Sequence, residues 1–346
     1  MANSGKPKML FSFFSVNDHY PSQSRTVPQL YAQVMHQCEL AESLGYDTFF
    51  CAEHHFHEYG VVPDPAVMLA AIAQRTKRIR LGTAISILTF HDPRRLAESY
   101  AMLDVISNGR LVYGVGSGYL KHEFEGYNAN PAEKRDRFNE NLDIMRKLLR
   151  GDRLAYKGKF SESTNVVLNV LPIQKEIPMY VAVLAPEAAY HVGKQGNRLF
   201  TVPYATTDNF EGVGTMIQQY QKGRAEAGMP HDDSDSIWCF HTHAAETEAE
   251  LRANAAEPFD LYVRSRLYAK SQTFDDIQRS GLALFGTVDQ LVDKVVRLYE
   301  MGARHISTLH NFGFMNPEIV DRSMILFAKE VMPRAEAKIA KLKMAA

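Results

Sequence analysis

Histidine and glutamate residues crowd the segment FFCAEHHFHEYG, residues 49 to 60, directly behind an apolar run. Imidazole can transfer a proton near neutral pH, because its unperturbed pKa is about 6.5, and it is also a common metal ligand. A neighbouring carboxylate can orient an imidazole or bind the same metal. The segment is therefore a metal site, a catalytic base held at the end of a strand, or a polar loop without chemistry.

A second histidine pair, His241 and His243, lies within SIWCFHTHA, residues 236 to 244. In a strand this spacing places both imidazoles on one face, as in metal hydrolases. Barrel metallohydrolases carry such a pair on an early strand and close the site with an aspartate on the last one, and neither feature occurs here. We therefore expect no metal and interpret the pair as pocket lining or as hydrogen-bonding partners of neighbouring groups.

Two segments have the composition of an anion site. Three glycines in GVGSGY, residues 114 to 119, follow a predicted strand, but the full spacing of the dinucleotide-binding fingerprint is missing. A helix predicted to begin at Pro186, straight after another strand, would offer its free N–H groups to an anion. Arg135 and Arg137, on a preceding helix, either reach the same anion or lie solvated on an exposed face.

The chain between these segments alternates apolar strands with amphipathic helices, and Asp64-Pro65 and Asp92-Pro93 are typical helix starts. Strands that are apolar throughout are typical of parallel sheets covered on both faces. Eight such strands, each followed by a helix, predict an α/β protein with a (β/α)8 TIM barrel, a single domain over residues 1 to 346 with insertions after strands 4 and 7. The predicted strands are residues 9–15, 47–52, 78–88, 110–118, 178–184, 198–204, 236–244 and 305–311.

The composition excludes several classes of protein. Hydrophobic residues make up 45% of the 346 residues, and the formal net charge is −1. That charge gives no electrostatic grip on nucleic acid or on an anionic membrane. No apolar run reaches the roughly 18 residues of a membrane span, the N-terminus does not resemble a signal peptide, and scattered cysteines fit a reducing compartment. We expect a cytoplasmic protein that binds neither nucleic acid nor membrane.

The active site of such a barrel lies at the carboxyl ends of the strands. Few of the polar residues at these ends are acidic and most can be neutral, which suits a large planar ligand and one transferable proton better than a hard cation. The polar residues at the predicted strand ends are Ser15, Glu53, His54, His55, Ser86, His91, Ser117, Tyr119, Glu187, His241, His243, His310 and Asn311.

The walls of the pocket are expected to be apolar and aromatic, with Phe13, Tyr119, Phe124, Tyr204 and Phe312 as candidates. The segment 258 to 285 follows the seventh strand, where long loops often serve as lids. Its candidates for facing either a polar substrate or solvent are Tyr262, Arg264, Arg266 and Tyr268.

An ordered set of segments resembles the bacterial luciferase-like family of flavin-dependent monooxygenases. The similarity runs from about residue 8 to residue 335, and residues 91 to 127 are its most specific part. The matching segments are AEHHF, EYG, RIRLGTAI, HDPRRLAESYAMLDVISNGRLVYGVGSGY, EFEGYN, GTVDQLVDKVVRLYEMGARHI and FAKEVMP.

The resemblance implies a (β/α)8 barrel that is a homodimer or a larger homo-oligomer. It implies reduced FMN as a co-substrate, supplied by a separate NAD(P)H:flavin reductase, and molecular oxygen, which forms a flavin C4a-(hydro)peroxide that oxygenates a small organic substrate. One branch of the family instead uses a deazaflavin for hydride transfer, and this activity is the main alternative. A metal-dependent hydrolase and a non-catalytic flavin-binding protein are further alternatives.

The resemblance also implies roles for single residues. The EHH motif places His54 beside the reactive edge of the flavin, where we expect it to handle the proton, with Glu53 orienting a neighbouring histidine. Ser117 stands where luciferase has a phosphate-binding arginine, and Arg135 aligns with a second family arginine, with Arg137 as the fallback. The expected flavin contacts are Glu53, Ser86, Ser117, Tyr119, Arg135, Ala185, Pro186 and Glu187.

Overall fold

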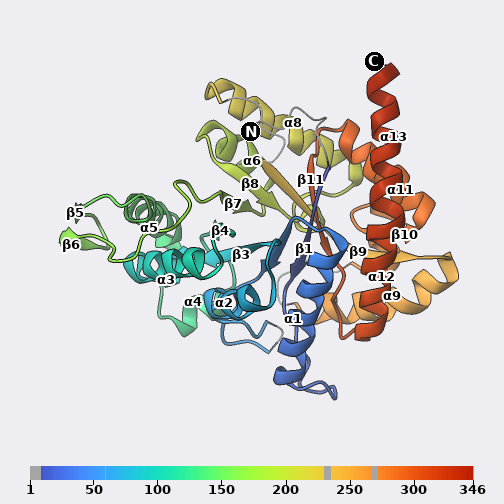
Figure 1. Cartoon of the computed structure of the whole chain (residues 1–346), viewed down its shortest axis with the longest axis horizontal. Helices are drawn as coiled ribbons and strands as arrows, with labels where there is room; N and C mark the ends of the chain where they lie inside the picture. The colour runs from blue at the N-terminus through green and yellow to red at the C-terminus, as the bar shows by residue number, and fades with distance from the viewer. Residues whose placement is uncertain (1–8, 59, 230–234, 267–271, 346) are drawn as a thin grey trace.

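A closed barrel of parallel strands forms the centre of the molecule in a computed structural model, which describes residues 9–58, 60–229, 235–266 and 272–345 (Figure 1). The barrel confirms the predicted fold, since each strand pairs in parallel with the next and β8 pairs with β9. In order around the barrel, the strands are β1 (Leu10–Ser15), β2 (Thr48–Cys51), β3 (Arg80–Ile87), β4 (Leu111–Gly116), β7 (Met179–Val183), β8 (Arg198–Thr201), β9 (Ser236–Ala245) and β11 (His305–Leu309).

Helices surround the barrel, and several begin as their sequence predicts. Asp64 and Asp92 each accept hydrogen bonds from the first backbone N–H groups of a helix whose first residue is proline. The helices that follow barrel strands are α1 (Val27–Leu44), α2 (Pro65–Arg75), α3 (Pro93–Ile106), α5 (Lys134–Leu149), α6 (Pro186–Lys194), α7 (Pro203–Thr206), α8 (Phe210–Glu226), α11 (Val288–Glu300), α12 (Pro317–Leu326) and α13 (Met332–Ala345). None of the described helices is both long and apolar enough to cross a bilayer.

Three phenylalanines fill the barrel lumen below its mouth. The ring centroid of Phe200 on β8 lies 5.3 Å from that of Phe50 on β2 and 6.1 Å from that of Phe14 on β1. Strands β2 and β8 are not neighbours in the sheet, so this contact crosses the lumen. Side chains alternate between the two faces along a strand, and residues at the same register position of neighbouring strands point the same way. Phe14, Phe50 and Phe200 therefore identify the residues that point into the lumen.

The two predicted insertions are present. The one after β4 contains α4 (Lys121–Gly126) and an antiparallel hairpin of β5 (Leu154–Lys157) and β6 (Glu162–Val166), at the left edge of Figure 1. The one after β9 contains α9 (Glu248–Arg264) and α10 (Phe274–Ser280). The sequence analysis expected no strand within this insertion, but β10 (Leu284–Thr287) extends the sheet by pairing with the end of β9.

Candidate active site

One side of the barrel mouth is lined by small residues, and we call the segment formed by β2, β3, β4 and β7 the small-residue half. Ala52 follows inward-facing Phe50 by two residues, and Ala182 shares the register position of inward-facing Phe200. A Cβ atom added to Gly116 would lie 2.4 Å from Cδ1 of Ile85 and 3.9 Å from Cβ of Ala182. A larger side chain at Gly116 would therefore clash with Ile85, and Ala52, Gly116 and Ala182 present only backbone and methyl groups at these strand ends.

His54 lies at the edge of this half, at the end of β2, and is buried. Its Nδ1 is 3.2 Å from Oε1 of Glu123, a fully buried carboxylate on α4 that also accepts a hydrogen bond from the backbone N–H of His55 (3.0 Å). Donation of Nδ1–H to Glu123 places the lone pair of neutral His54 on Nε2. Burial lowers the pKa of His54, against the raising effect of Glu123, so the imidazole is neutral at neutral pH and can accept a proton.

Glu53 points to the other side of the same loop and joins two histidines. Its Oε1 lies 2.9 Å from Nε2 of His55 and 2.8 Å from Nε2 of His91, and its Oε2 accepts the N–H of Ile87 (3.3 Å). Burial opposes ionisation of Glu53, but the hydrogen bonds from the two histidines outweigh it and hold its pKa below the ordinary value. Burial disfavours charge on His91 as well, yet Glu53 raises its pKa overall. Glu53 was predicted to orient a neighbouring histidine, and its carboxylate hydrogen-bonds to the imidazoles of His55 and His91.

The same three side chains also have the geometry of a small metal site. Among the residues that the structure describes, Glu53, His55 and His91 have donor atoms that lie within 4.8 Å of one another. Nδ1 of His55 is in turn 3.0 Å from the hydroxyl of Tyr127, whose ring stacks on Phe90 with centroids 4.8 Å apart. The hydrogen bonds account for every one of these contacts without a metal ion.

The residues predicted to bind the phosphate lie where β4 and β7 end. Thr89 donates hydrogen bonds to the carbonyl oxygens of Ser117 (2.9 Å) and Lys134 (3.4 Å), which ties the end of β4 to the start of α5. Gly118 has a φ of +76°, which suits glycine, and its carbonyl accepts a hydrogen bond from Nζ of Lys134 (3.5 Å). Tyr119 is exposed. Lys134 is thus a cation at the end of β4 that the sequence analysis missed.

The helix start at Ala185, Pro186 and Glu187 is exposed, as an anion site requires, and α6 follows directly on β7. Arg135 is also exposed. Arg137 forms an ion pair with Glu133 (2.9 Å) and stacks on Phe160, with 4.2 Å from its guanidinium carbon to the ring centroid. Arg137 and His91 both line a separate cavity of about 290 Å³ between η1 (Leu88–Phe90), α5 and the hairpin.

Two predicted site residues make contacts on the helix side of the barrel. Ser86 is fully buried and its hydroxyl hydrogen-bonds to the hydroxyl of Tyr100 on α3, so its predicted flavin contact stays a prediction. Phe13 also points outward, where its ring packs on Phe49 at a centroid distance of 5.5 Å, and it belongs to the core rather than to the pocket. Phe124 packs on Phe90 at 4.9 Å.

The opposite side of the mouth is aromatic, and we call the segment formed by β8, β9, β11 and α9 the aromatic half. Its centre is His241, which shares the register position of Leu309 and faces inward at the end of the part of β9 that pairs with β11. Four rings surround its imidazole, with centroid distances of 4.8 to 5.7 Å: Tyr204, Phe259, Tyr262 and Phe312. Of the predicted pocket aromatics, Tyr204 and Phe312 therefore meet here.

The imidazole of His241 has no hydrogen bond to any described residue, and its exposed fraction is 1%. Burial, with a smaller effect of the charge of Arg266, lowers its pKa to about 3. Burial likewise lowers the pKa of His243 to about 4. His241 and His243 are therefore neutral at physiological pH, and they are not part of the group whose donor atoms could share one ion.

Arg266 follows α9 and lies over the same mouth. Its guanidinium carbon is 4.0 Å from the ring centroid of Tyr262, and its charge acts on His241, on His54 across the mouth and on Asp18 after β1. Arg264 is exposed instead and pairs with Glu257 (2.8 Å). The sequence left open whether these residues face a substrate or solvent. Tyr262 and Arg266 lie against the aromatic cluster at the mouth, whereas Arg264 faces solvent. Tyr268 lies outside the described residues.

Hydrogen bonds of Asp18 and a close backbone contact of Gly313 fix the loop that carries Phe312, and we call this group of contacts the brace. Oδ2 of Asp18 accepts hydrogen bonds from the hydroxyl of Tyr20 and from the N–H of Gly313, both 2.7 Å. Gly313 has a φ of +62°, and an added Cβ would lie 1.6 Å from the carbonyl oxygen of Pro258 on α9. Only glycine allows the loop after β11 to touch α9 in this way.

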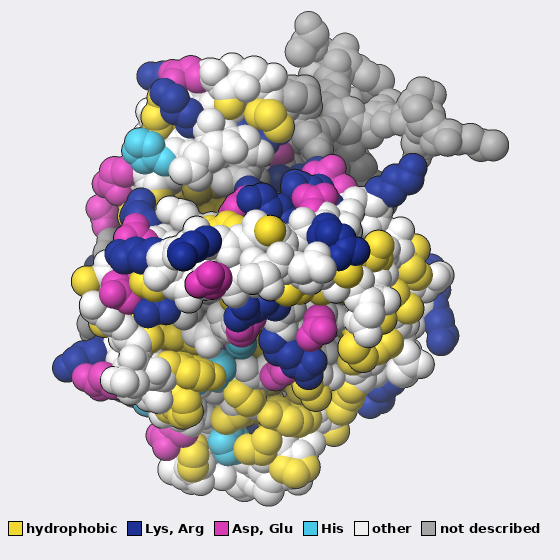
Figure 2. Space-filling view, turned by 90° about the vertical axis from the view of Figure 1, so that its left-hand side faces the viewer, with side chains coloured by type: hydrophobic (Ala, Val, Ile, Leu, Met, Phe, Trp, Pro, Cys, Tyr) yellow, Lys and Arg dark blue, Asp and Glu magenta, His cyan; other side chains and the backbone are white. Residues whose placement is uncertain are grey.

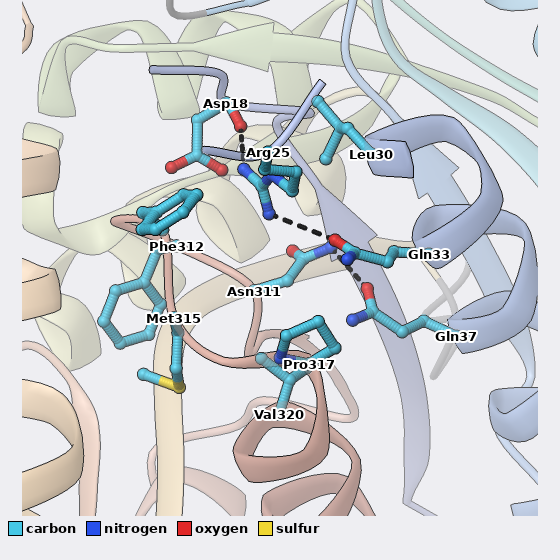
Figure 3. Close-up of a pocket in the computed structure, with 11 residues that line it drawn as sticks. Asp18, Arg25, Leu30, Gln33, Gln37, Asn311, Phe312, Met315, Pro317 and Val320 are labelled. Carbon is cyan, nitrogen blue, oxygen red and sulfur yellow. Dashed lines mark hydrogen bonds between the residues drawn. The ribbon is translucent and has the colours of Figure 1, made fainter. Parts of the chain in front are cut away.

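Figure 3 shows the polar side of this brace, where Arg25 donates to the Asp18 carbonyl (2.7 Å) and to Gln33 (3.3 Å) and Asn311 donates to Gln37 (2.8 Å). The cavity among these residues has about 10 Å³, room for about one water, so it is too small for a flavin or a substrate.

The chain is also similar to known proteins. A family model described as luciferase-like monooxygenase matches residues 9–305. The chain belongs to this family. The membership confirms the resemblance inferred from the EHH motif and from residues 91 to 127.

Individual relatives span most of the chain. The oxygenase component of a flavin-dependent trigonelline monooxygenase from Acinetobacter baylyi is 29% identical over 73% of this chain and 71% of its own length. The crystal structure of the monooxygenase RslO1 from Streptomyces bottropensis superposes with a TM-score of 0.87 at 30% identity, over 94% of this chain and 99% of that one. An F420-dependent glucose-6-phosphate dehydrogenase from Microbacterium testaceum is 24% identical over 87% of this chain and 92% of its own.

Proposed function

We propose that this protein is a monooxygenase that takes reduced FMN from a separate NAD(P)H:flavin reductase and uses O2 to oxygenate a small organic substrate. The observation that carries the proposal is the buried pair of His54 and Glu123 at the end of β2, together with the small residues Ala52, Gly116 and Ala182 at the ends of β2, β4 and β7. A flat ring system fits there, and a neutral imidazole is placed to handle a proton at its edge.

These residues fit a flavin mononucleotide in both of its parts. The ring would lie against the small-residue half, and the phosphate would lie toward the free N–H groups of α6, near Ala185, Pro186 and Glu187, with Ser117, Tyr119 and a cation from Lys134 or Arg135. Bound reduced FMN supplies the electrons that activate O2. The chain itself orients the ring, moves a proton at Nε2 of His54 and excludes water with the aromatic half.

Hydride transfer with a deazaflavin is the alternative, because F420-dependent dehydrogenases are also relatives at 24% identity. Anaerobic titration of the protein with photoreduced FMN and with reduced F420 separates the two. We expect saturable binding of reduced FMN and, after air is admitted, oxygen uptake that increases with added substrate. Binding of reduced F420 alone, with no oxygen uptake, would establish the alternative. About one metal ion per purified chain would instead support a hydrolase.

We also propose a homo-oligomer, which the exposed apolar face of α3 supports. Met102 is 50% exposed, Val105 42% and Ile106 41%. Figure 2 shows this side of the molecule, where apolar side chains gather in the lower half. Light scattering of the purified protein tests the mass, and we expect Met102→Lys to reduce it to that of the monomer.

A further inference from the structure

Three side-chain donor atoms from two separate segments converge beside His54. Glu53 and His55 are its neighbours in the sequence, and His91 comes from the turn between η1 and α3. Oε1 of Glu53 lies 2.9 Å from Nε2 of His55 and 2.8 Å from Nε2 of His91, and the three atoms lie within 4.8 Å of one another. One carboxylate oxygen thus faces two imidazole nitrogens, which is a donor set that Zn²⁺ and related ions prefer.

Each of these three residues is held by a further hydrogen bond. Nδ1 of His55 lies 3.0 Å from the hydroxyl of Tyr127, and Oε2 of Glu53 accepts a backbone N–H of β3 (3.3 Å). The backbone carbonyl of His91 accepts a hydrogen bond from Nδ2 of Asn141 (3.2 Å). Metal-binding side chains usually have such outer partners, which fix the tautomer and the orientation of each ligand. The three side chains are therefore oriented before an ion binds.

An ion can replace the protons that join these side chains. When Nδ1–H of His55 donates to the Tyr127 hydroxyl, Nε2 of the neutral imidazole carries the lone pair that binds a metal. A four-coordinate ion with bonds of about 2.0–2.1 Å separates its ligand atoms by about 3.3 Å, so each imidazole would withdraw from Glu53 by only about half an ångström. The hydrogen bonds thus hold the ligands close to the positions that a bound ion requires.

The cluster is open on one side. The exposed fraction of the side chain is 1% for Glu53 and 4% for His55 but 25% for His91. His91 lines the cavity of about 290 Å³, so an ion can enter from there and a water can complete its coordination. Arg94 and Arg137 also line this cavity, and each forms an ion pair with a nearby acid, which offsets their repulsion of a cation.

From these contacts we infer that Glu53, His55 and His91 form a binding site for one divalent transition-metal ion of the zinc type. The site goes beyond the proposed function and does not require flavin. Its nitrogen donors favour such an ion over Mg²⁺ or Ca²⁺, which prefer oxygen ligands. Because Glu53 and His55 flank His54, the ion fixes the loop that presents Nε2 of this histidine. The sequence analysis expected no metal, since the sequence does not show that His91 lies beside Glu53.

The experiment uses Co²⁺ alone as the probe, added to the full chain after treatment with a chelator, because its visible spectrum reports the coordination number. We expect saturable binding of one Co²⁺ per chain in a four- or five-coordinate site, with displacement by Zn²⁺ but not by an equal concentration of Mg²⁺. His91→Gln keeps a hydrogen-bonding group beside Glu53 but removes the imidazole, and it should weaken binding at least about 100-fold. Absence of saturable binding, or an ion held equally well by His91→Gln, would overturn the inference.

His36 provides the matched control, because its Nε2 lies 2.9 Å from a single carboxylate, that of Asp321. His36→Gln should keep the wild-type affinity for Co²⁺, and a loss equal to that in His91→Gln would contradict the inference. Tyr127→Phe removes only the hydroxyl that orients His55 and should weaken binding about tenfold.

Thermal melting shows whether each variant folds, and Zn²⁺ should raise the melting temperature of the wild type but not that of His91→Gln. If His91→Gln does not fold, Tyr127→Phe decides, and an unchanged affinity in that variant would refute the site. Reduced FMN is titrated separately into the ion-free protein, so that failure of flavin binding and failure of ion binding give different results.

Discussion

The two halves of the barrel mouth are built in opposite ways. The small-residue half consists of residues with little or no side chain, because Ala52, Gly116 and Ala182 stand at the ends of β2, β4 and β7. The aromatic half consists of large side chains, because rings from α9 and from the loop after β11 pack against His241. The first half depends on backbone positions fixed by the barrel, and the second depends on an insertion that the barrel only supports.

This difference indicates how one barrel can keep a cofactor and change its substrate. A surface of backbone and methyl groups has few side chains to vary and suits an invariant flat ligand. A wall of side chains from an insertion can change without disturbing the strands. The following predictions test whether the halves are as separate as their construction indicates.

The largest expected effect is on the proton chemistry of the small-residue half. His54→Ala should reduce turnover at least about 100-fold, the usual span for a general acid or base, and leave the affinity for reduced FMN near normal. His36→Ala, an exposed histidine on α1, is the control. Stopped-flow measurement of flavin binding and of product formation separates the two quantities. Full activity in His54→Ala would remove this residue from the catalytic role.

The phosphate end of the same half should depend on a cation. Lys134→Ala and Arg135→Ala are each expected to weaken FMN binding, by about 1.5–3 kcal/mol for the residue that bonds the phosphate. Riboflavin has the same ring without the phosphate, so its affinity should be unchanged in both variants. Fluorescence titration with both flavins makes the comparison. Unchanged FMN affinity in both variants would place the phosphate contact elsewhere.

A smaller effect on flavin affinity is expected from a larger side chain at Gly116. Gly116→Ala should weaken flavin binding about tenfold, because overpacking costs about 1–3 kcal/mol and the new Cβ would lie 2.4 Å from Cδ1 of Ile85. Ile85→Val removes that methyl group, so the double variant should recover part of the affinity. Fluorescence titration with reduced FMN measures both affinities, and an unchanged affinity in Gly116→Ala would place the flavin ring elsewhere.

The last expected effect is on stability in acid rather than on activity or affinity, and it concerns the aromatic half. Burial lowers the pKa of His241 to about 3, whereas an unfolded histidine titrates near 6.5, so between these values the unfolded chain binds the extra proton. Stability should therefore fall as pH falls below about 6.5. His241→Phe should make that fall shallower by up to about 1.4 kcal/mol per pH unit.

Urea unfolding at several pH values between 4 and 7 measures this slope. Phe312→Leu is the control, because it removes packing against His241 without removing a titratable group, so it should lower stability equally at each pH. Equal slopes in the wild type and in His241→Phe would show that the imidazole is solvated in the folded state.

The sequence predicted the barrel and the contiguous histidine loop after β2 better than it predicted which distant residues meet at the mouth. Helix starts such as Asp92-Pro93 depend on local chemistry, and the EHH motif is contiguous, so both are readable in one stretch. Glu123 was missed although it lies in the quoted EFEGYN, because nothing local shows that its carboxylate turns back 69 positions to His54. Lys134 was missed beside Arg135 because helix periodicity alone did not show which side chain meets Gly118.

The aromatic half could not be predicted as a unit. Its rings come from three distant parts of the chain, at Tyr204, at Phe259 and Tyr262, and at Phe312, and each one alone fits an ordinary core position. The strand β10 was missed for a related reason, since the short segment Leu284–Thr287 after a helix does not reveal that it pairs with the end of β9.

That extra strand has a consequence for engineering. The first half of β9 pairs with β11 in the barrel, and its second half pairs with β10. The insertion between β9 and β10 is therefore hydrogen-bonded to the sheet at both of its ends. A segment anchored at both ends in this way can be exchanged between relatives while the pairing of β9 with β10 is kept. Chimaeras cut at Glu246 and Ala283 should trade substrate preference while the scaffold beneath keeps its melting temperature.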